Sequence, residues 1–200
     1  MSVRGKVTYT MNDEWYTPSA YVEAARTAMG SIDVDPASCA FAQKTVRATV
    51  WFSKEDDGLA RPWAGNVWLN PPYTATAAWV ATLAKRYTRG EIAQACLLVN
   101  ASTETRWFQP LFDRPLCFVG SNAIATAGRI RFERDGPQKM SPVSGSAIAY
   151  FGTREHAFAS AFCTFGRVVV PYDFPAAHRA SFPCTGQLVH GEDFCPRCDP

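Results

Sequence analysis

The sequence predicts an α/β fold in which a mostly parallel sheet ends in antiparallel strands. Predicted strands and helices alternate over the first half of the chain, which is typical of parallel strands joined by helices. The run 95–99 is apolar throughout, as expected of a strand buried on both faces of a sheet. Beyond residue 115 the predicted strands cluster, which indicates that the far end of the sheet is antiparallel.

The elements of the first half follow from capping residues and apolar spacing. A helix is expected to begin at Thr17 and Pro18, because a hydroxyl N-cap followed by proline in the first helical position is a favourable start. Apolar residues at helical spacing follow, and Gly30 can end the helix. A second helix is predicted over 76–87, where the apolar residues share one face. The strands predicted between the two helices are 32–35, 46–52 and 67–69.

The second half of the chain is expected to begin with a helix over 103–112. The strands predicted after it are 116–119, 129–133, 147–151 and 167–170. Beyond residue 170 the sequence becomes polar and rich in proline, cysteine and histidine. We therefore expect one folded domain over 1–170 and a small Cys/His-rich tail over 171–200.

The composition limits the class of protein. Of the 200 residues 47% are apolar, which predicts a globular chain with a buried core. The net charge of +2 permits a local basic patch for nucleic acid without requiring one. We expect no membrane partner, since no segment is long enough to span a bilayer, and no obligate protein partner is evident. Seven cysteines, an odd number, without an export signal favour a cytoplasmic protein with reduced thiols.

Asn70-Pro71-Pro72-Tyr73 is the most informative stretch, and it follows the short apolar run 67–69. Two prolines remove two backbone donors and fix φ, so a central strand must stop here. What remains is a rigid elbow that presents a side-chain amide, carbonyl oxygens and an aromatic ring. Such groups suit a planar substrate with an amino group, because the oxygens can accept its N–H bonds while the ring stacks on its face.

Acidic residues follow two of the predicted strands. Asp33 and Asp35 lie at the end of the first strand beside Pro36, and the loop 54–59 precedes the strand of the elbow. In a doubly wound sheet such segments project near the carboxyl ends of the strands, where these folds bind ligands. The alternative is that each acid is only a loop or cap residue; the pair beside Pro36 favours a ligand-binding role.

Six segments occur in one order along the chain: Trp15-Tyr16-Thr17-Pro18, Asp33-Val34-Asp35-Pro36, 54–59, Asn70-Pro71-Pro72-Tyr73, Thr105-Arg106-Trp107-Phe108 and Gly128-Arg129-Ile130-Arg131-Phe132. Over roughly residues 12–155 this ordered set resembles the phage-type DNA N6-adenine methyltransferases, the Dam-like enzymes of bacteriophages and prophages. The chain departs from methyltransferases in general at the loop 36–41, which lacks the glycine-rich turn that usually follows their first strand.

The resemblance implies a Rossmann-like S-adenosylmethionine-dependent methyltransferase sheet, S-adenosyl-L-methionine as methyl donor and adenine in DNA as acceptor. The implied catalytic residues are Asn70, Pro71, Pro72 and Tyr73. The implied cofactor-binding residues are Thr17, Pro18, Asp33, Asp35, Pro36 and Asp57. A carboxylate suits the ribose hydroxyls or the cationic groups of this cofactor, and its adenine can stack on an aromatic ring.

The elbow alone leaves other functions open. Methylation of cytosine N4, RNA adenine or a protein glutamine could use the same chemistry, and a non-catalytic nucleic-acid-binding protein could keep the fold. The motifs that flank the elbow favour DNA adenine. Arg106, Arg129 and Arg131 are the candidate DNA contacts, because they lie beside aromatic residues as in nucleic-acid-binding surfaces. These arginines could equally be solvated neighbours of core aromatics.

The tail carries a candidate metal site. Cys184, His190, Cys195 and Cys198 form a C-x5-H-x4-C-x2-C array. Three thiolates and an imidazole could close a tetrahedral structural zinc site. The alternative is an unstructured tail with free thiols.

Overall fold

The computed structural model describes residues 15–120, 128–133 and 144–171. Its helices, with two short 3-10 helices labelled η, are α1 (Ser19–Met29), α2 (Ala40–Val46), η1 (Tyr73–Ala75), α3 (Thr76–Thr88), η2 (Gln109–Asp113) and α4 (Glu155–Phe162). Its strands are β1 (Val34–Asp35), β2 (Val50–Trp51), β3 (Asn66–Leu69), β4 (Gln94–Asn100), β5 (Leu116–Val119), β6 (Ser146–Phe151) and β7 (Gly166–Val169).

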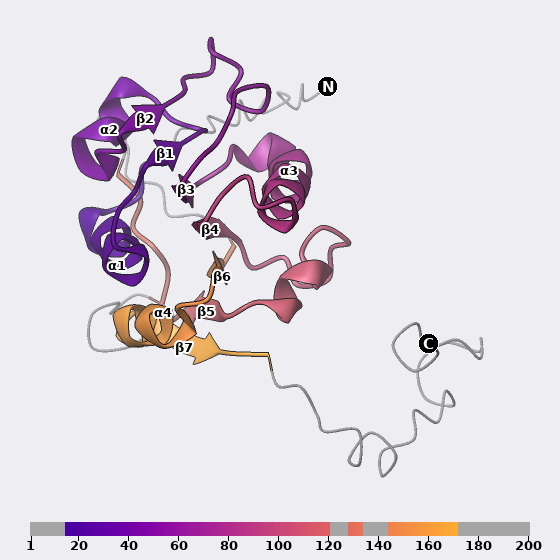
Figure 1. Ribbon diagram of the computed structural model, residues 1–200. Helices are drawn as coiled ribbons and strands as arrows, with labels where there is room; N and C mark the ends of the chain where they lie inside the picture. The colour runs from indigo at the N-terminus through magenta and orange to yellow at the C-terminus, as the bar shows by residue number, and fades with distance from the viewer. Residues whose placement is uncertain (1–14, 121–127, 134–143, 172–200) are drawn as a thin grey trace, which may run out of the picture. The chain divides into compact units, whose positions relative to one another are not determined.

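The seven strands form one mixed sheet in the order β2-β1-β3-β4-β6-β5-β7 (Figure 1). Strands β2, β1, β3 and β4 pair in parallel. Strand β6 is antiparallel to both β4 and β5, and β7 is antiparallel to β5. The predicted α/β fold with a parallel first half and an antiparallel far end is confirmed.

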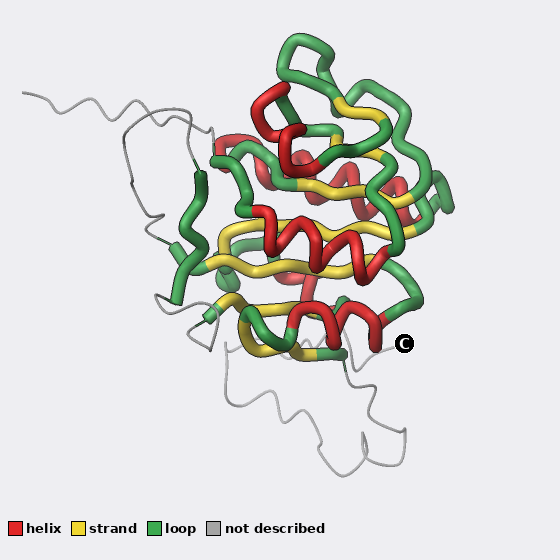
Figure 2. Tube along the Cα trace, turned by 90° about the vertical axis from the view of Figure 1, so that its left-hand side faces the viewer, coloured by secondary structure: helices red, strands yellow, loops and turns green. Residues whose placement is uncertain are grey.

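Helices cover both faces of the sheet, and each face has its own apolar cluster. Helices α1 and α4 pack on one face together with Cys96 and Leu98 of β4. On the other face α3 and η2 pack with Leu97 and Val99, because successive side chains of a strand point to opposite faces. Figure 1 shows the strands between the two layers, and Figure 2 shows helices lying in front of the strands.

Three predicted elements were wrong. The strand predicted over 46–52 is mostly absent: helix α2 extends to Val46, Arg47 ends it in a left-handed conformation, and only Val50–Trp51 pairs as a strand. The segment 103–112 contains turns and part of η2 instead of an α-helix, since the Thr105 hydroxyl donates to the Ser102 carbonyl at 2.7 Å and competes with helical bonding. Of 129–133, only Glu133 pairs, with Tyr16.

The chain divides into two units, Met1–Val170 and Pro171–Pro200. The assignment of a methyltransferase domain to 1–170 and of a zinc module to the tail stays a prediction, because residues 172–200 lie outside the described residues. In the part of the chain that the structure describes, no helix is long and apolar enough to cross a membrane.

Candidate active site

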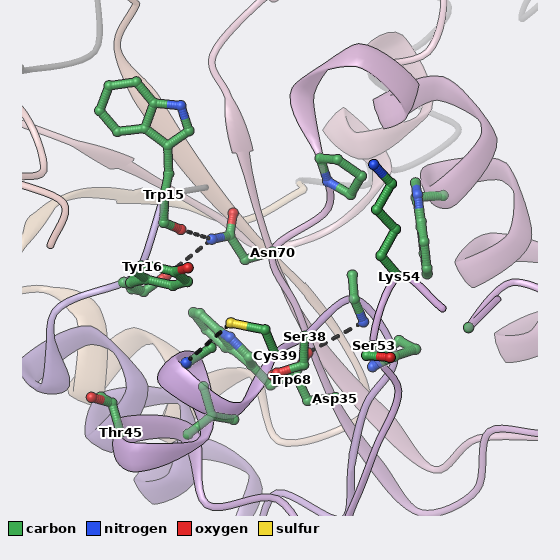
Figure 3. A pocket seen from close by; sticks show the side chains of 18 of the residues that line it. Trp15, Tyr16, Asp35, Ser38, Cys39, Thr45, Ser53, Lys54, Trp68 and Asn70 are labelled. Atoms are coloured by element: carbon green, nitrogen blue, oxygen red, sulfur yellow. Dashed lines mark hydrogen bonds between the residues drawn. The ribbon is translucent and has the colours of Figure 1, made fainter. Parts of the chain in front are cut away.

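A cavity of about 590 Å³ lies at the carboxyl ends of the parallel strands, in the size range of small-molecule sites (Figure 3). Its walls come from the segment before α1, from the loops after β1, β2 and β3, and from helix α2. The lining residues used below are Trp15, Thr17, Asp35, Pro36, Lys54, Glu55, Asp57, Gly58, Trp68, Asn70, Pro72, Thr74 and Trp79. Ligands of open α/β sheets bind at this edge of the sheet.

The side-chain amide of Asn70 is held by the segment before α1. Its Nδ2 donates to the Trp15 carbonyl at 2.9 Å and to the Thr17 hydroxyl at 3.3 Å. Because a backbone carbonyl can only accept, the nitrogen must face Trp15 and the oxygen must point away from it, as Figure 3 shows. Among the described residues, none donates to Asn70 Oδ1. The amide therefore presents an acceptor at the elbow.

Of the two proline carbonyls of the elbow, one closes a turn and the other has no backbone donor among the described residues. Ala75 N–H donates to the Pro72 carbonyl at 3.0 Å, which closes the 3-10 turn of η1. No described backbone donor bonds to the Pro71 carbonyl, so this oxygen is a second acceptor beside Asn70. The Tyr73 ring is half-buried, with its centroid 6.4 Å from that of Trp15.

Two segments that are distant in the sequence meet beside the elbow. Tyr16 and Glu133 form an antiparallel bridge, with N···O distances of 3.1 and 2.8 Å. The Trp15 ring then contacts Phe132 edge to face, with the centroids 5.7 Å apart. This pairing positions the carbonyl that orients Asn70.

Asp35 ends β1 and lies on the cavity wall, where it is only 2% exposed. Its Oδ2 accepts a hydrogen bond from Gln43 Nε2 at 2.9 Å, and its Oδ1 accepts a weaker one from Ala37 N at 3.4 Å. Burial raises the pKa of Asp35 from 3.8 to about 7, although hydrogen bonds from Ser38, Ala37 and Gln43 act in the opposite direction. A buried carboxyl poised near neutrality beside a cavity is typical of a functional site.

The structure does not bring Asp33 to this cavity. Its Oδ1 accepts a bond from Ser31 Oγ at 2.9 Å, and its Oδ2 accepts one from Asn66 N at 2.8 Å. Asn66 begins β3, so Asp33 lies towards the amino end of that strand, about 6–7 Å back along the chain from Asp35. Through the bond from Asn66 N, its carboxylate links the residue before β1 to the first residue of β3.

Of the remaining predicted cofactor-binding residues, three line the cavity and one does not. Thr17, Pro36 and Asp57 line the cavity, whereas Pro18 lies outside it as the N-cap of α1. In the acidic loop, Asp56 accepts bonds from Ser53 N and Oγ and closes a turn, so Glu55 and Asp57 are the acids on the cavity wall.

Gly58 explains how a glycine-free loop can follow β1. A Cβ on Gly58 would lie 1.8 Å from the Pro36 carbonyl oxygen, so only glycine permits the two loops to approach this closely. The glycine that this region requires therefore lies in the loop after β2, where it permits contact with the loop after β1.

The three candidate DNA-contact arginines, Arg106, Arg129 and Arg131, are at least partly exposed. Arg129 and Arg131 lie in the segment that pairs with Tyr16. The candidate metal ligands Cys184, His190, Cys195 and Cys198 lie outside the described residues. Within residues 15–120, 128–133 and 144–171, no group of three or more His, Cys, Asp or Glu side chains could hold a metal ion.

Sequence reasoning missed Gln43, which donates to Asp35 on the cavity wall, and the roles of several residues that line the cavity. Gln43 comes from a helix that was not predicted, and a lone glutamine in a polar segment gave no signal. Trp68 and Trp79 were assigned to the strand and to the helical face, and each also lines the cavity. Lys54 also lines the cavity; the sequence analysis placed it in the loop 54–59 but gave it no role.

These groups fit S-adenosylmethionine. Carboxyl groups at Asp35, Glu55 and Asp57 suit the ribose hydroxyls and the cationic groups, and tryptophan rings offer apolar surface to the adenine. Such a cavity, next to an Asn-Pro-Pro-Tyr elbow on a sheet of this topology, defines an amino-methyltransferase.

Comparison with known families identifies the chain further. It belongs to the family of DNA N-6-adenine-methyltransferase (Dam), whose model matches residues 4–151. No curated protein and no solved structure gives a match. The protein is thus a DNA N6-adenine methyltransferase, with S-adenosylmethionine as its methyl donor and DNA as its substrate. The inferred family is confirmed, and DNA adenine is preferred over the other acceptors considered.

Proposed function

We propose that Asn70 and Pro71 bind the amino group of the target adenine and that Tyr73 stacks on its ring. The orientation of the Asn70 amide carries this proposal. Its nitrogen is engaged by Trp15 and Thr17, so Oδ1 is available as an acceptor beside the Pro71 carbonyl. The two hydrogens of an exocyclic amino group require two such acceptors.

The two acceptors act on a weak nucleophile. The lone pair of the adenine amino nitrogen is delocalised into the ring, so the nitrogen is planar and poorly nucleophilic. Hydrogen bonds to Asn70 Oδ1 and Pro71 O draw it towards tetrahedral geometry, fix its lone pair in one direction and stabilise the positive charge that develops on it. The base must first leave the duplex, and stacking on Tyr73 stabilises it outside.

The cavity beside the elbow is the proposed cofactor site. S-adenosylmethionine supplies an electrophilic methyl group on a sulfonium. Asp35 offers a carboxylate to the cationic part of that ligand, and Asp57 offers one to its hydroxyls from the loop after β2, with Thr17 and Pro36 completing the lining. Asp33 and Pro18 support β1 and α1 in this proposal and do not contact the cofactor.

Two substitutions at Asn70 test the proposal. Asn70→Ala removes the acceptor and should lower transfer from labelled S-adenosylmethionine to unmethylated duplex DNA by at least about a hundredfold, while cofactor binding measured by calorimetry is largely kept. Asn70→Asp retains acceptor oxygens but cannot donate to Trp15 and Thr17. The carboxylate should therefore be misoriented, and the variant should have intermediate activity. Full activity of Asn70→Ala would refute the proposed roles, and N4-methylcytosine among the labelled nucleosides would redirect the choice of acceptor.

The arginines Arg106, Arg129 and Arg131 are proposed to contact phosphates of the DNA. Each lies beside an aromatic residue or in a segment that contains one, and two belong to the segment next to the elbow. Arg131→Gln should weaken DNA binding evenly across sequences and reduce the slope of log K against log salt concentration by about one. An unchanged slope would remove Arg131 from the interface.

The tail beyond residue 170 is proposed to be a separate zinc module next to a methyltransferase domain over 1–170. Its ligand array and the loss of apolar pattern at residue 170 support this division. Purified full-length protein should contain one zinc per chain, and the variant Cys195→Ser/Cys198→Ser should contain none; metal-free wild type would exclude the module. The substrate and the free thiols of Cys39, Cys96, Cys117 and Cys163 favour action in the cytoplasm of a bacterial or phage-infected cell.

A further inference from the structure

The loop after β2 places an acid of the cofactor cavity in an uncommon backbone conformation. Asp57 has a φ of 52°, in the left-handed region that residues other than glycine rarely adopt. Gly58 follows it and lies against the Pro36 carbonyl. A backbone of this kind persists only where surrounding contacts fix it. The structure provides such contacts from two residues that do not line the cavity, Trp63 and Arg86.

Trp63 fixes the loop through a backbone carbonyl. Its side chain is 2% exposed, and its Nε1 donates to the Gly58 carbonyl at 2.8 Å. The Trp63 ring stacks on that of Trp79, with the centroids 6.0 Å apart and the planes at 14°. Trp79 belongs to α3 and lines the cavity. Trp63 therefore connects the peptide next to Asp57 with the wall that α3 provides.

Arg86 contacts the same loop from the last turn of α3. Its Nη2 donates to the carbonyls of Leu59 at 3.2 Å and Arg61 at 2.9 Å. Its guanidinium carbon lies 4.9 Å from the centroid of the Trp63 ring. A planar guanidinium can stack on a ring and donate several hydrogen bonds at once, which the ammonium of a lysine cannot do. Trp79 and Arg86 are about two helical turns apart on α3, so Trp63 can contact both.

Ion pairing alone does not explain why Arg86 turns inward. Its acidic partner is Glu91 at 3.0 Å, and the two side chains are 18% and 36% exposed. A pair of this kind forms equally well at the surface, where it contributes little to stability. The Arg86 Nε is also buried without a hydrogen-bond partner among the described residues, which costs free energy. The contacts with the loop carbonyls and with Trp63 account for the inward position.

We propose that Arg86 and Trp63 are positioning residues that fix the loop after β2 for cofactor binding, and that they act through Asp57. The inference rests on the proposed cofactor site, because Asp57 must then contact S-adenosylmethionine, whereas Arg86 and Trp63 do not touch it. A loop that is fixed in advance loses little conformational entropy on binding, so the cofactor binds more tightly. Loss of either positioning residue should lower cofactor affinity and leave methyl transfer in the bound complex unchanged.

The test combines calorimetry with S-adenosylmethionine and steady-state kinetics on unmethylated duplex DNA. Arg86→Ala should raise the Kd and the KM for the cofactor by about tenfold, the equivalent of one hydrogen bond from a charged group, while kcat and the KM for DNA stay within about twofold of wild type. Trp63→Phe keeps an aromatic ring but loses the donor to Gly58, so it should raise the Kd by about threefold or more. If Arg86→Ala does not fold, Trp63→Phe tests the same proposal.

Two controls separate positioning from a folding defect. Arg89→Ala removes a charge from the same end of α3 and should bind the cofactor normally, because Arg89 is 60% exposed and pairs with Glu91 at 3.7 Å. Guanidinium ion at millimolar concentration should restore cofactor affinity to Arg86→Ala, because it can stack on Trp63 and donate to the loop carbonyls. Sodium ion at the same ionic strength should not. An equal response to both salts would indicate a structural defect and overturn the proposal.

A double-mutant cycle tests whether Arg86 acts through Asp57. Asp57→Asn removes the carboxylate but keeps a residue that tolerates the left-handed region. In that background Arg86→Ala should weaken cofactor binding by less than about threefold, because little remains to be positioned. Losses that multiply fully, or a fall in kcat and DNA affinity equal to that in cofactor affinity, would overturn the proposal. Normal binding by Arg86→Ala beside impaired Asp57→Asn would overturn the positioning role alone, whereas normal binding by Asp57→Asn would overturn the proposed cofactor site.

Discussion

The substitution Asp35→Asn should change the stability of the protein in a pH-dependent way. Asp35 is buried at the cavity wall, and its pKa is raised from 3.8 to about 7 mainly by desolvation. The folded state therefore binds a proton more tightly than the unfolded chain. The stability gained from this proton is fully present below pH 3.8 and is lost as the pH rises to about 7.

The magnitude follows from linkage. Between these two pKa values the free energy of unfolding falls by about 1.36 kcal/mol per pH unit, so wild type should lose about 3 kcal/mol between pH 5 and pH 8 from this group alone. The amide introduced by the substitution does not titrate. The stability of Asp35→Asn relative to wild type should therefore rise by about 3 kcal/mol over the same range, even though the amide accepts one hydrogen bond fewer.

The assay is urea denaturation of both proteins at several pH values without cofactor. A difference in unfolding free energy that stays constant from pH 5 to pH 8 would refute the reasoning, because it would mean that the Asp35 carboxyl is not desolvated in the folded state. Calorimetry with S-adenosylmethionine is the complementary measurement. If Asp35 binds the cationic part of the cofactor, wild type should release a proton on binding below pH 7, and Asp35→Asn should not.

Two further predictions concern the residues that support this wall. Gln43→Leu removes a donor 2.9 Å from Asp35 Oδ2, and should raise the pH midpoint of cofactor binding by about one unit; an unchanged midpoint would show that Gln43 does not act through Asp35. Gly58→Ala places a Cβ against the Pro36 carbonyl and should weaken cofactor binding by about tenfold or more, whereas the control Gly120→Ala, where the nearest atom is 3.9 Å away, should bind normally. Equal affinities of the two glycine variants would contradict the role given to Gly58.

The sequence predicted the elements that have strong local signals. The apolar run 95–99 lies within β4, which is buried on both faces. Helix α1 ends before Gly30 as expected, but it begins at Ser19 with Pro18 as its N-cap, and the Thr17 hydroxyl that was expected to cap it bonds to Asn70 instead. The elbow was recognised because the full tetrapeptide Asn70-Pro71-Pro72-Tyr73 resembles the catalytic motif of amino-methyltransferases, whereas two prolines after a strand alone indicate only a turn. Each of these features is encoded within a few neighbouring residues.

The errors arose where tertiary contacts decide the structure. Helix α2 buries only Val46 and so has no apolar face to detect; the side chains of Cys39 and Gln43 satisfy backbone N–H groups near its two ends. Asp33 and Asp35 are equivalent by composition, yet only Asp35 lies at the carboxyl end of the strand. The pairing of Tyr16 with Glu133 joins segments from opposite ends of the domain, which no local pattern can indicate.

That pairing also affects when the enzyme can become active during its synthesis. The carbonyl that orients Asn70 belongs to a segment near the beginning of the chain, and its bridging partner Glu133 is translated long after the elbow itself. A nascent chain that has completed the elbow and β4 still lacks this partner, and closing so long a loop is entropically costly and slow. The catalytic amide should therefore acquire its orientation late, so that chains interrupted before residue 133 can fold part of the sheet without becoming active methyltransferases.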